Sequence, residues 1–148
     1  MNSSDHAQLR YIERIIGIKG REAKHYLGRN REVVSRHIEK MFSHATFLWE
    51  GKLASPKTRR FYLRDDIILI TDQHENCVIT LYRADYGFSQ STNRQFVKEL
   101  LELIEHKRDV QAKTDDEFKL QRLEYEIKDC CIKIINSIEY RMELEQVS

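Results

Sequence analysis

Residues 59–83, RRFYLRDDIILITDQHENCVITLYR, decide the fold of this chain. The stretch contains three runs rich in β-branched and aromatic residues, 59–64, 67–72 and 77–83. Short polar connections separate the runs, two residues at Asp65-Asp66 and four at 73–76. Runs of this kind with short connections are typical of strands joined by hairpin turns. We therefore predict an antiparallel β-meander, with one more strand before it at 47–49 and a turn at 54–57.

The loop lengths also predict which residues of the meander lie opposite each other. In that register Leu63 opposes Ile68 and Phe61 opposes Ile70. On the next pair of strands, Ile70 opposes Ile79 and Ile68 opposes Leu81. Because alternate residues of a strand face opposite sides of the sheet, the register defines an apolar core face. Its members are Phe61, Leu63, Ile68, Ile70, Cys77, Ile79 and Leu81.

The opposite face of the predicted sheet is mixed in character. It collects Arg60, Tyr62, Arg64, Ile67, Leu69, Thr71, Val78, Thr80 and Tyr82. Arginines beside tyrosines suit phosphate contact and base stacking, so one interpretation is a nucleic-acid surface. The other interpretation, which we favour slightly, is that a helix covers Ile67, Leu69 and Val78 and the arginines only fringe it.

Upstream of the strands, the apolar spacing predicts three helices. The first covers residues 5–16 and ends at Gly17, the second covers 21–27 and ends at Gly28, and the third covers 32–43. His37 lies in the apolar row of the third helix, which favours a structural histidine over a catalytic one.

Downstream, two segments match the capping-box pattern that starts helices, at residues 92–95 and 114–117. The second helix should run from about residue 115 to 145, roughly 45 Å at 1.5 Å per residue. Its apolar stripe is wider than a strict two-position seam, which predicts an αα-hairpin whose exposed side associates with a second copy. The alternative is that this side packs back onto the mixed face of the sheet. The predicted oligomer interface is Leu120, Leu123, Ile127, Ile134, Ile138 and Met142.

Length and composition agree with an α+β chain of two modules. The chain has 148 residues, 41% hydrophobic and 33% charged, which suits a globular fold. We expect a helix-plus-β-meander module at residues 1–90 and a helical association module at 91–148. Without an apolar run long enough to span a bilayer or an apolar signal core at the start, we expect a cytoplasmic protein with no membrane contact.

Charge and metal-ligand patterns narrow the expected partners. Residues 1–64 hold 14 Lys/Arg and 6 Asp/Glu, a net charge of +8, although the whole chain carries only +1. A basic front of this kind suits RNA, an acidic protein or the acidic tail of a second copy. The three cysteines and six histidines lack metal-ligand spacing, so we expect reduced thiols, no metal site and no cofactor.

Residues 24–83 resemble a known family. The resemblance is carried by Lys24-His25 and Arg29, the helix with Val34, Ile38 and Met41, and the segments 48–51, 59–62, 66–72 and 78–83 in that order. This arrangement is similar to the BrnT/RelE-like toxin fold of the barnase, EndoU, colicin and RelE nuclease group. The resemblance implies one or two helices before an antiparallel sheet and RNA cleavage without a metal. It further implies His25 as acid or base, Arg60 on phosphate, and Tyr82 as stacking residue or proton shuttle.

Taken together, these patterns favour a non-enzymatic interaction or regulatory protein, inhibitor-like or antitoxin-like. Such a protein would form a homodimer through its C-terminal helices and dock on a protein or RNA partner. The predicted nucleic-acid contacts are Lys24, Arg29, Arg31, Arg36, Arg60, Tyr62 and Arg64. Two alternatives stay open. One is a metal-independent endoribonuclease of the toxin group. The other is a DNA-binding regulator that uses residues 21–43 as a helix-turn-helix with its turn at Gly28.

Overall fold

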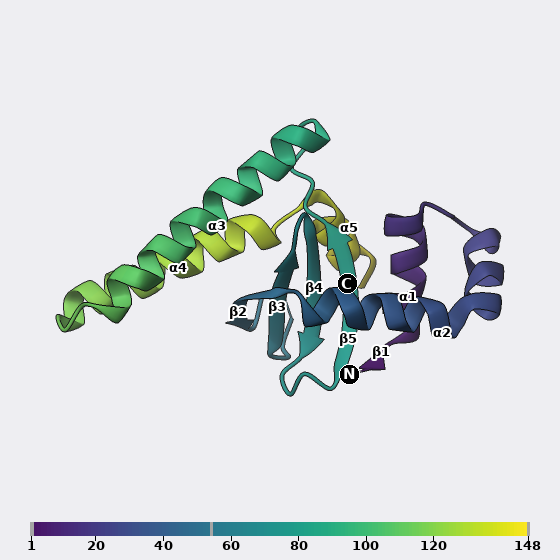
Figure 1. Ribbon diagram of the computed structural model, residues 1–148, viewed down its shortest axis with the longest axis horizontal. Coiled ribbons are helices and arrows are strands. Elements are labelled where there is room, and N and C mark those ends of the chain that lie inside the picture. Colours follow the sequence, from purple (N-terminus) through teal and green to yellow (C-terminus); the bar gives the residue numbers. More distant parts are fainter. Residues whose placement is uncertain (1, 54, 148) are drawn as a thin grey trace. The chain divides into compact units, whose positions relative to one another are not determined.

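A computed structural model describes residues 2–53 and 55–147, and it confirms the α+β class. The chain divides into two units, the first ending at Arg83 and the second beginning at Ala84 (Figure 1). The division falls earlier than residue 91, where the sequence placed it. The predicted turn at residues 54–57 includes Ala54, which lies outside the described residues.

The first unit contains the sheet. Its strands in the described residues are β1 (Asn2–Ser3), β2 (Thr46–Gly51), β3 (Arg59–Arg64), β4 (Ile67–Asp72) and β5 (Cys77–Arg83). Their order is β1-β5-β4-β3-β2, with antiparallel pairing from β2 to β5 and a parallel pairing of β1 with β5. The sequence predicted the bounds of β3, β4 and β5. It missed β1, because two polar residues give no strand signal.

The predicted register holds between β3 and β4 and fails along part of β5. Leu63 pairs with Ile68 and Phe61 with Ile70, as expected. Ile70 pairs with Thr80 rather than with Ile79, and Ile68 pairs with Tyr82 rather than with Leu81. The cause is a register shift between Ile70 and Thr71, where β5 carries one extra residue. Beyond this bulge, every side chain of β5 faces the side opposite to the predicted one.

The bulge reassigns residues between the two faces of the sheet. Leu81 lies on the face of Leu69, whereas Thr80 and Tyr82 share the face of Ile68. Phe61, Leu63, Ile68 and Ile70 are buried on the predicted core face, whereas the predicted faces of Thr80, Leu81 and Tyr82 were wrong. The sequence could not show the bulge, because hairpin loop lengths fix the register only near the turn.

Helices cover the face of Tyr62 and Leu69. These are α1 (Asp5–Tyr11), the π-helical turn η1 (Ile12–Ile16) and α2 (Arg21–Ser43). Their apolar side chains form one cluster with that face: Ala7, Tyr11, Ile12, Ala23, Leu27, Val34 and Ile38 with Tyr62, Ile67, Leu69, Val78 and Leu81. The favoured interpretation of the mixed face, a helix over Ile67, Leu69 and Val78, is therefore confirmed.

Helix α2 consists of two helical segments that meet at a kink, which agrees with the two helices predicted for residues 21–27 and 32–43, although the junction is not at Gly28. Gly28 keeps the helical conformation, and the non-helical residue is Asn30, with φ −130° and ψ 23°. The Asn30 side chain donates a hydrogen bond from Nδ2 to the carbonyl oxygen of Tyr26, at 3.0 Å. An asparagine side chain that bonds its own backbone competes with helical pairing, which accounts for the kink at this position. The junction between the two helical segments is therefore at Asn30, two residues after the turn predicted at Gly28.

The second unit is helical, with α3 (Gln90–Ala112), α4 (Glu117–Ile135) and α5 (Ile138–Val147). Helix α3 begins earlier than the capping box at 92–95 suggested, because Ser89 caps it and accepts from the Thr92 amide. Asp116 rather than Thr114 caps α4. The single long helix predicted for residues 115–145 is wrong, since the chain leaves helical geometry at Asn136 (φ −80°, ψ 65°) and restarts at Ile138.

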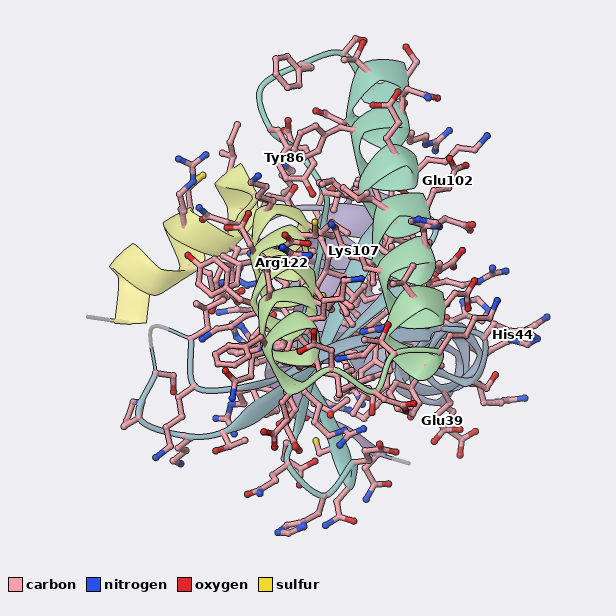
Figure 2. All side chains as sticks on the ribbon, turned by 90° about the vertical axis from the view of Figure 1, so that its left-hand side faces the viewer. Glu39, His44, Tyr86, Glu102, Lys107 and Arg122 are labelled. Atoms are coloured by element: carbon pink, nitrogen blue, oxygen red, sulfur yellow. The ribbon has the colours of Figure 1, made fainter. Side chains whose placement is uncertain are left out.

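Helices α3 and α4 lie side by side along their length (Figure 1). An ion pair joins them, with Lys107 Nζ of α3 2.8 Å from Glu126 Oε2 of α4. Figure 2 shows Lys107 between the two helices. This pair lowers the pKa of the Glu126 carboxyl through the hydrogen bond from Lys107. At the start of the unit, Tyr86 donates from its hydroxyl to the Ile134 carbonyl oxygen at 2.6 Å.

Candidate functional site

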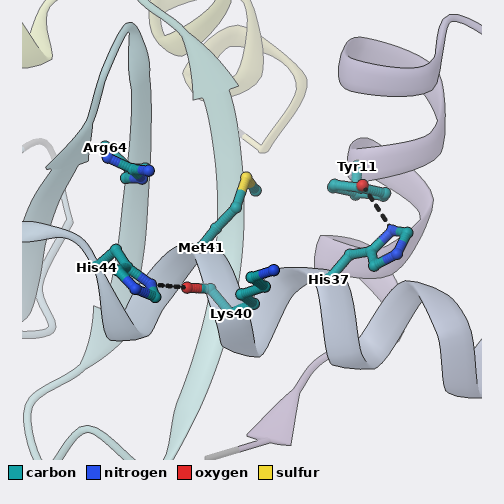
Figure 3. A pocket seen from close by; sticks show the side chains of 6 residues that line it. All are labelled: Tyr11, His37, Lys40, Met41, His44 and Arg64. Carbon is teal, nitrogen blue, oxygen red and sulfur yellow. Dashed lines mark hydrogen bonds between the residues drawn. The ribbon is translucent and has the colours of Figure 1, made fainter.

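A pocket of about 290 Å³ opens beside the second half of α2 in the first unit. Its lining comes from three elements: Tyr11 of α1, Arg64 of β3, and His37, Lys40, Met41 and His44 along α2 (Figure 3). The four α2 positions share one side of the helix, because residues spaced by three, four and seven positions recur at nearly the same angle. Val34 and Ile38, one step around the helix, belong to the core cluster. The pocket therefore sits where the buried side of α2 meets its surface.

His37 is held at the α1 end of the pocket. Its Nδ1 lies 3.1 Å from the Tyr11 hydroxyl oxygen, and the two rings meet edge to face with centroids 6.1 Å apart. Burial, and secondarily Tyr26, raises the pKa of the Tyr11 hydroxyl, so this group stays protonated. The bond orients an imidazole whose ring is otherwise exposed. The contact with Tyr11 agrees with the structural histidine that the sequence favoured at this position. The exposure of the ring does not follow from that prediction.

His44 is held at the other end of the pocket, where it caps the C-terminus of α2. Its Nδ1 lies 3.0 Å from the Lys40 carbonyl oxygen and 3.0 Å from the Ser43 hydroxyl. A carbonyl oxygen can only accept, so the Lys40 contact requires the proton on Nδ1. The neutral ring then presents Nε2 as an acceptor, and the charged ring presents it as a donor.

The pocket is cationic. Lys40 and Arg64 supply permanent charges, His37 and His44 supply charge when protonated, and its described lining includes no carboxylate. One acidic side chain contacts this lining, Asp65, whose carboxylate lies 3.7 Å from the Arg64 guanidinium. Both of these side chains are largely exposed, which makes the pair weak. Such a site is suited to an anion.

A second polar cluster lies on the same sheet face but is internally satisfied. Arg60 contacts the Glu50 carboxylate at 3.2 Å and the Glu75 carboxylate at 3.0 Å, and it donates to the Tyr62 hydroxyl at 2.9 Å. Its guanidinium also lies 4.5 Å from the Phe47 ring centroid. The Tyr62 hydroxyl donates to Glu75 at 2.6 Å. The cluster joins β2 and β3 to the β4–β5 loop, and its members are already bonded to one another, which leaves little capacity for a ligand.

The structure separates the predicted nucleic-acid residues. Arg64 lines the pocket, Arg36 is exposed on α2, and Lys24 and Arg29 are exposed on the half of α2 before the kink. Arg31 donates to Asp5 at 2.5 Å and to Gln8 at 2.9 Å, so it ties α2 to α1. Tyr62 is 6% exposed, which leaves no ring face for stacking on a base.

The three residues that the resemblance assigned to catalysis are absent from the pocket lining. His25 is exposed on the first half of α2, and Arg60 belongs to the satisfied cluster. Tyr82 is fully buried, on the face to which the β5 bulge turns it. A buried tyrosine contacts no substrate base without movement of the sheet.

The predicted oligomer interface is mostly interior. Leu123, Ile127 and Ile134 are buried within the chain, and Leu120 and Ile138 are partly buried. Only Met142, at 54% exposure, is open. Most of this apolar stripe is therefore not available to a second subunit.

Sequence reasoning missed Tyr11, Lys40, Met41 and His44 as pocket residues. The spacing of His37, Lys40 and His44 on one helix side was a detectable signal. The approach of Arg64 was not, since it depends on the tertiary packing of β3 and α2. Among the described residues, no group of three or more histidine, cysteine or acidic side chains is arranged to hold a metal ion.

Comparisons of the chain with protein-family models, with curated proteins and with solved structures found no match. None of the described helices has both the length and the apolar composition needed to cross a bilayer.

Proposed function

We propose that the chain is a non-enzymatic regulatory protein that docks on single-stranded RNA through the α2 pocket. The observation that carries this proposal is the lining itself, two permanent cations and two oriented imidazoles without a carboxylate. In the same proposal, the C-terminal helices form an αα-hairpin that associates with a second copy.

The length of the site favours a polyanion over a single phosphate. His37 and His44 lie seven residues apart on α2, about 10 Å along the helix axis at 1.5 Å per residue. Lys40 lies between them, and Arg64 joins from β3. A row of donors this long matches successive phosphates of an extended strand, and the backbone dominates the affinity of such complexes.

One feature favours RNA over DNA. The Tyr11 hydroxyl and the histidine Nε2 atoms place hydrogen-bonding groups beside the phosphate donors, where a ribose 2′-hydroxyl can bind them. The pocket volume of about 290 Å³ is compatible with one unpaired strand.

The test is fluorescence anisotropy with a labelled single-stranded RNA of about 15 nucleotides at several salt concentrations. Lys40→Ala combined with Arg64→Ala should weaken binding at least tenfold and lower the salt slope by about one for each lost phosphate contact. Lys57→Ala, an exposed lysine outside the pocket, is the matched control and should change affinity less than twofold. Absence of RNA binding by the unaltered protein, or equal loss in both variants, would refute the proposal. Equal binding of DNA of the same sequence would refute the role of the 2′-hydroxyl.

A ribonuclease is the second candidate, and a specific observation favours it. Both pocket histidines are held through Nδ1, at Tyr11 and at Lys40, so both direct Nε2 away from these contacts. Metal-free RNA cleavage requires a base that removes the 2′-hydroxyl proton and an acid that protonates the leaving 5′-oxygen. Two oriented imidazoles are suited to those roles.

Cleavage of RNA in EDTA tests this candidate. Loss of cleavage in His37→Ala and in His44→Ala would assign it to the pocket. Loss in His25→Ala instead would support the assignment that follows from the BrnT/RelE-like resemblance. Binding without cleavage would leave the non-enzymatic function in place.

A further inference from the structure

Helix α4 carries a second apolar stripe on its outer side. Phe118 is 85% exposed and Tyr125 is 72% exposed, the two largest exposures among the large apolar side chains described. Positions 118, 125 and 132 are seven residues apart, so Phe118, Tyr125 and Ile132 fall on one line along the helix. Leu123 and Ile127 point to the opposite side and are buried.

Two residues of opposite charge lie beside this aromatic line, one on the N-terminal side of Tyr125 and one on its C-terminal side. Arg122 precedes Tyr125 by three positions, and Asp129 follows it by four. Both fall within a quarter turn of the aromatic line, and their side chains are 66% and 52% exposed. Each has only a weak exposed partner on its own helix: Glu126, 4.0 Å from Arg122, and Lys133, 3.2 Å from Asp129. Figure 2 shows Arg122 on α4.

An antiparallel second copy of α4 is complementary to this face. In two antiparallel helices related by a two-fold axis near Tyr125 and Glu126, Arg122 of each copy lies opposite Asp129 of the other. The two tyrosines then meet near the axis, and Phe118 lies beside Ile132 of the second copy.

The antiparallel arrangement uses one patch of α4 for both sides of the contact. Arg122 and Asp129 lie on the same flank of the aromatic line, and an antiparallel two-fold axis brings that flank of one copy against the same flank of the other. The two oppositely charged residues therefore pair twice, once on each side of the axis. A two-fold arrangement of one patch is also the commonest form of self-association.

We infer that the Phe118–Tyr125 face of α4 is the contact surface of an antiparallel homodimer, with Arg122 and Asp129 pairing across its two-fold axis. The inference rests on the self-association proposed above. It assigns the contact surface to the exposed side of α4, with Phe118 and Tyr125, instead of the buried side with Leu123 and Ile127. Helix α4 has 19 residues and offers a contact about 28 Å long.

The first experiment measures mass by multi-angle light scattering during size-exclusion chromatography, over a range of protein concentrations. The unaltered chain should be a dimer, and Phe118→Ser with Tyr125→Ser should raise the dimer dissociation constant at least tenfold. Both side chains are exposed, so this variant should keep its fold, which circular dichroism checks. Phe88→Ser, at an exposed aromatic residue that precedes α3, is the control and should remain dimeric.

The second experiment tests orientation by charge exchange. Arg122→Asp and Asp129→Arg should each weaken the dimer at least tenfold, because each places like charges across the axis. The combination of the two should recover dimerisation to within about threefold of the unaltered chain. Failure of the combination to recover would overturn the antiparallel pairing.

The outcomes separate this inference from the broader proposal. A dimer that persists in Phe118→Ser with Tyr125→Ser overturns the α4 face while self-association stands. A chain that remains monomeric at all concentrations overturns both. RNA affinity measured on the same variants tests the α2 pocket independently.

Discussion

The hydroxyl oxygen of Tyr11 lies 3.1 Å from Nδ1 of His37, and this contact links α1 to the pocket side of α2. Tyr11 is 7% exposed and belongs to the core cluster, so its position is fixed by packing. A buried residue thereby orients an exposed imidazole. This hydrogen bond therefore connects the core of the first unit with the α2 pocket.

Removal of the Tyr11 hydroxyl should affect both stability and binding. Tyr11→Phe keeps the packed ring and loses the hydrogen bond, which costs about 1 kcal/mol of unfolding free energy. The freed His37 ring should reduce RNA affinity about threefold, measured by anisotropy beside urea unfolding. Tyr26→Phe is the control, because the structure shows Tyr26 in a hydrogen bond through its backbone carbonyl. A larger effect of Tyr26→Phe than of Tyr11→Phe would contradict the proposed role of this bond.

Removal of both pocket imidazoles should weaken binding to RNA. His37 and His44 line the two ends of the pocket, and each presents a ring nitrogen that can contact the strand. His37→Gln combined with His44→Gln should lower RNA affinity at least threefold in the anisotropy assay. An unchanged affinity in this double variant would argue against the pocket as the RNA site.

The second unit should lose stability in alkaline solution. Burial raises the pKa of the Cys131 thiol from 9.0 to about 11 and that of the Tyr140 hydroxyl from 10.0 to about 12. Between those values the unfolded chain has released protons that the folded chain retains, so the free energy of unfolding falls as the pH rises. The stabilising contribution is complete below pH 9 and declines from there towards pH 12.

Urea unfolding at pH 8 and at pH 10.5 measures this decline. Cys131→Ala and Tyr140→Phe should each reduce the difference between the two pH values, although each also removes packed atoms and lowers stability at pH 8. A stability that rises between pH 8 and pH 10.5 would contradict the expected sign.

Two glycines of the first unit should respond to alanine in opposite ways. Gly28 lies in the helical part of α2 with open space around the position of a Cβ, so Gly28→Ala should stabilise by up to about 1 kcal/mol. Gly17 ends η1 at φ +91°, so Gly17→Ala should destabilise by about 1 kcal/mol despite its open surroundings. Thermal unfolding of both variants measures the two effects. Destabilisation by Gly28→Ala would indicate that residue 28 forms a turn, as a helix-turn-helix requires.

Local signals in the sequence predicted the strands well and their pairing only in part. The bounds of β3, β4 and β5 follow from propensity and turn residues, which are local properties. The pairing of β5 beyond Thr80 depends on one extra residue in the strand, and no turn signal encodes it. The break at Asn136 was missed for a similar reason, because the apolar spacing of the helix continues through it.

The candidate site was harder to predict than the fold. Arg64 was named as a nucleic-acid contact for its place on a sheet face, and it does line the pocket. Arg60 and Tyr62 were named on the same ground, but Glu50 and Glu75 engage them. Which arginine is engaged and which is open depends on acidic residues far along the chain. Composition shows the surplus of positive charge without showing where it is neutralised.

The short strand β1 has a practical consequence for anyone who handles this chain. The amide of Asn2 donates to the Asn76 carbonyl and the amide of Ser4 donates to the Val78 carbonyl, so the first residues shield the outer margin of β5. If these residues are removed, or displaced by a bulky tag, the backbone donors and acceptors along this edge of β5 become exposed. Strands of neighbouring molecules can then pair with that edge, which promotes aggregation. An affinity label belongs at the opposite terminus.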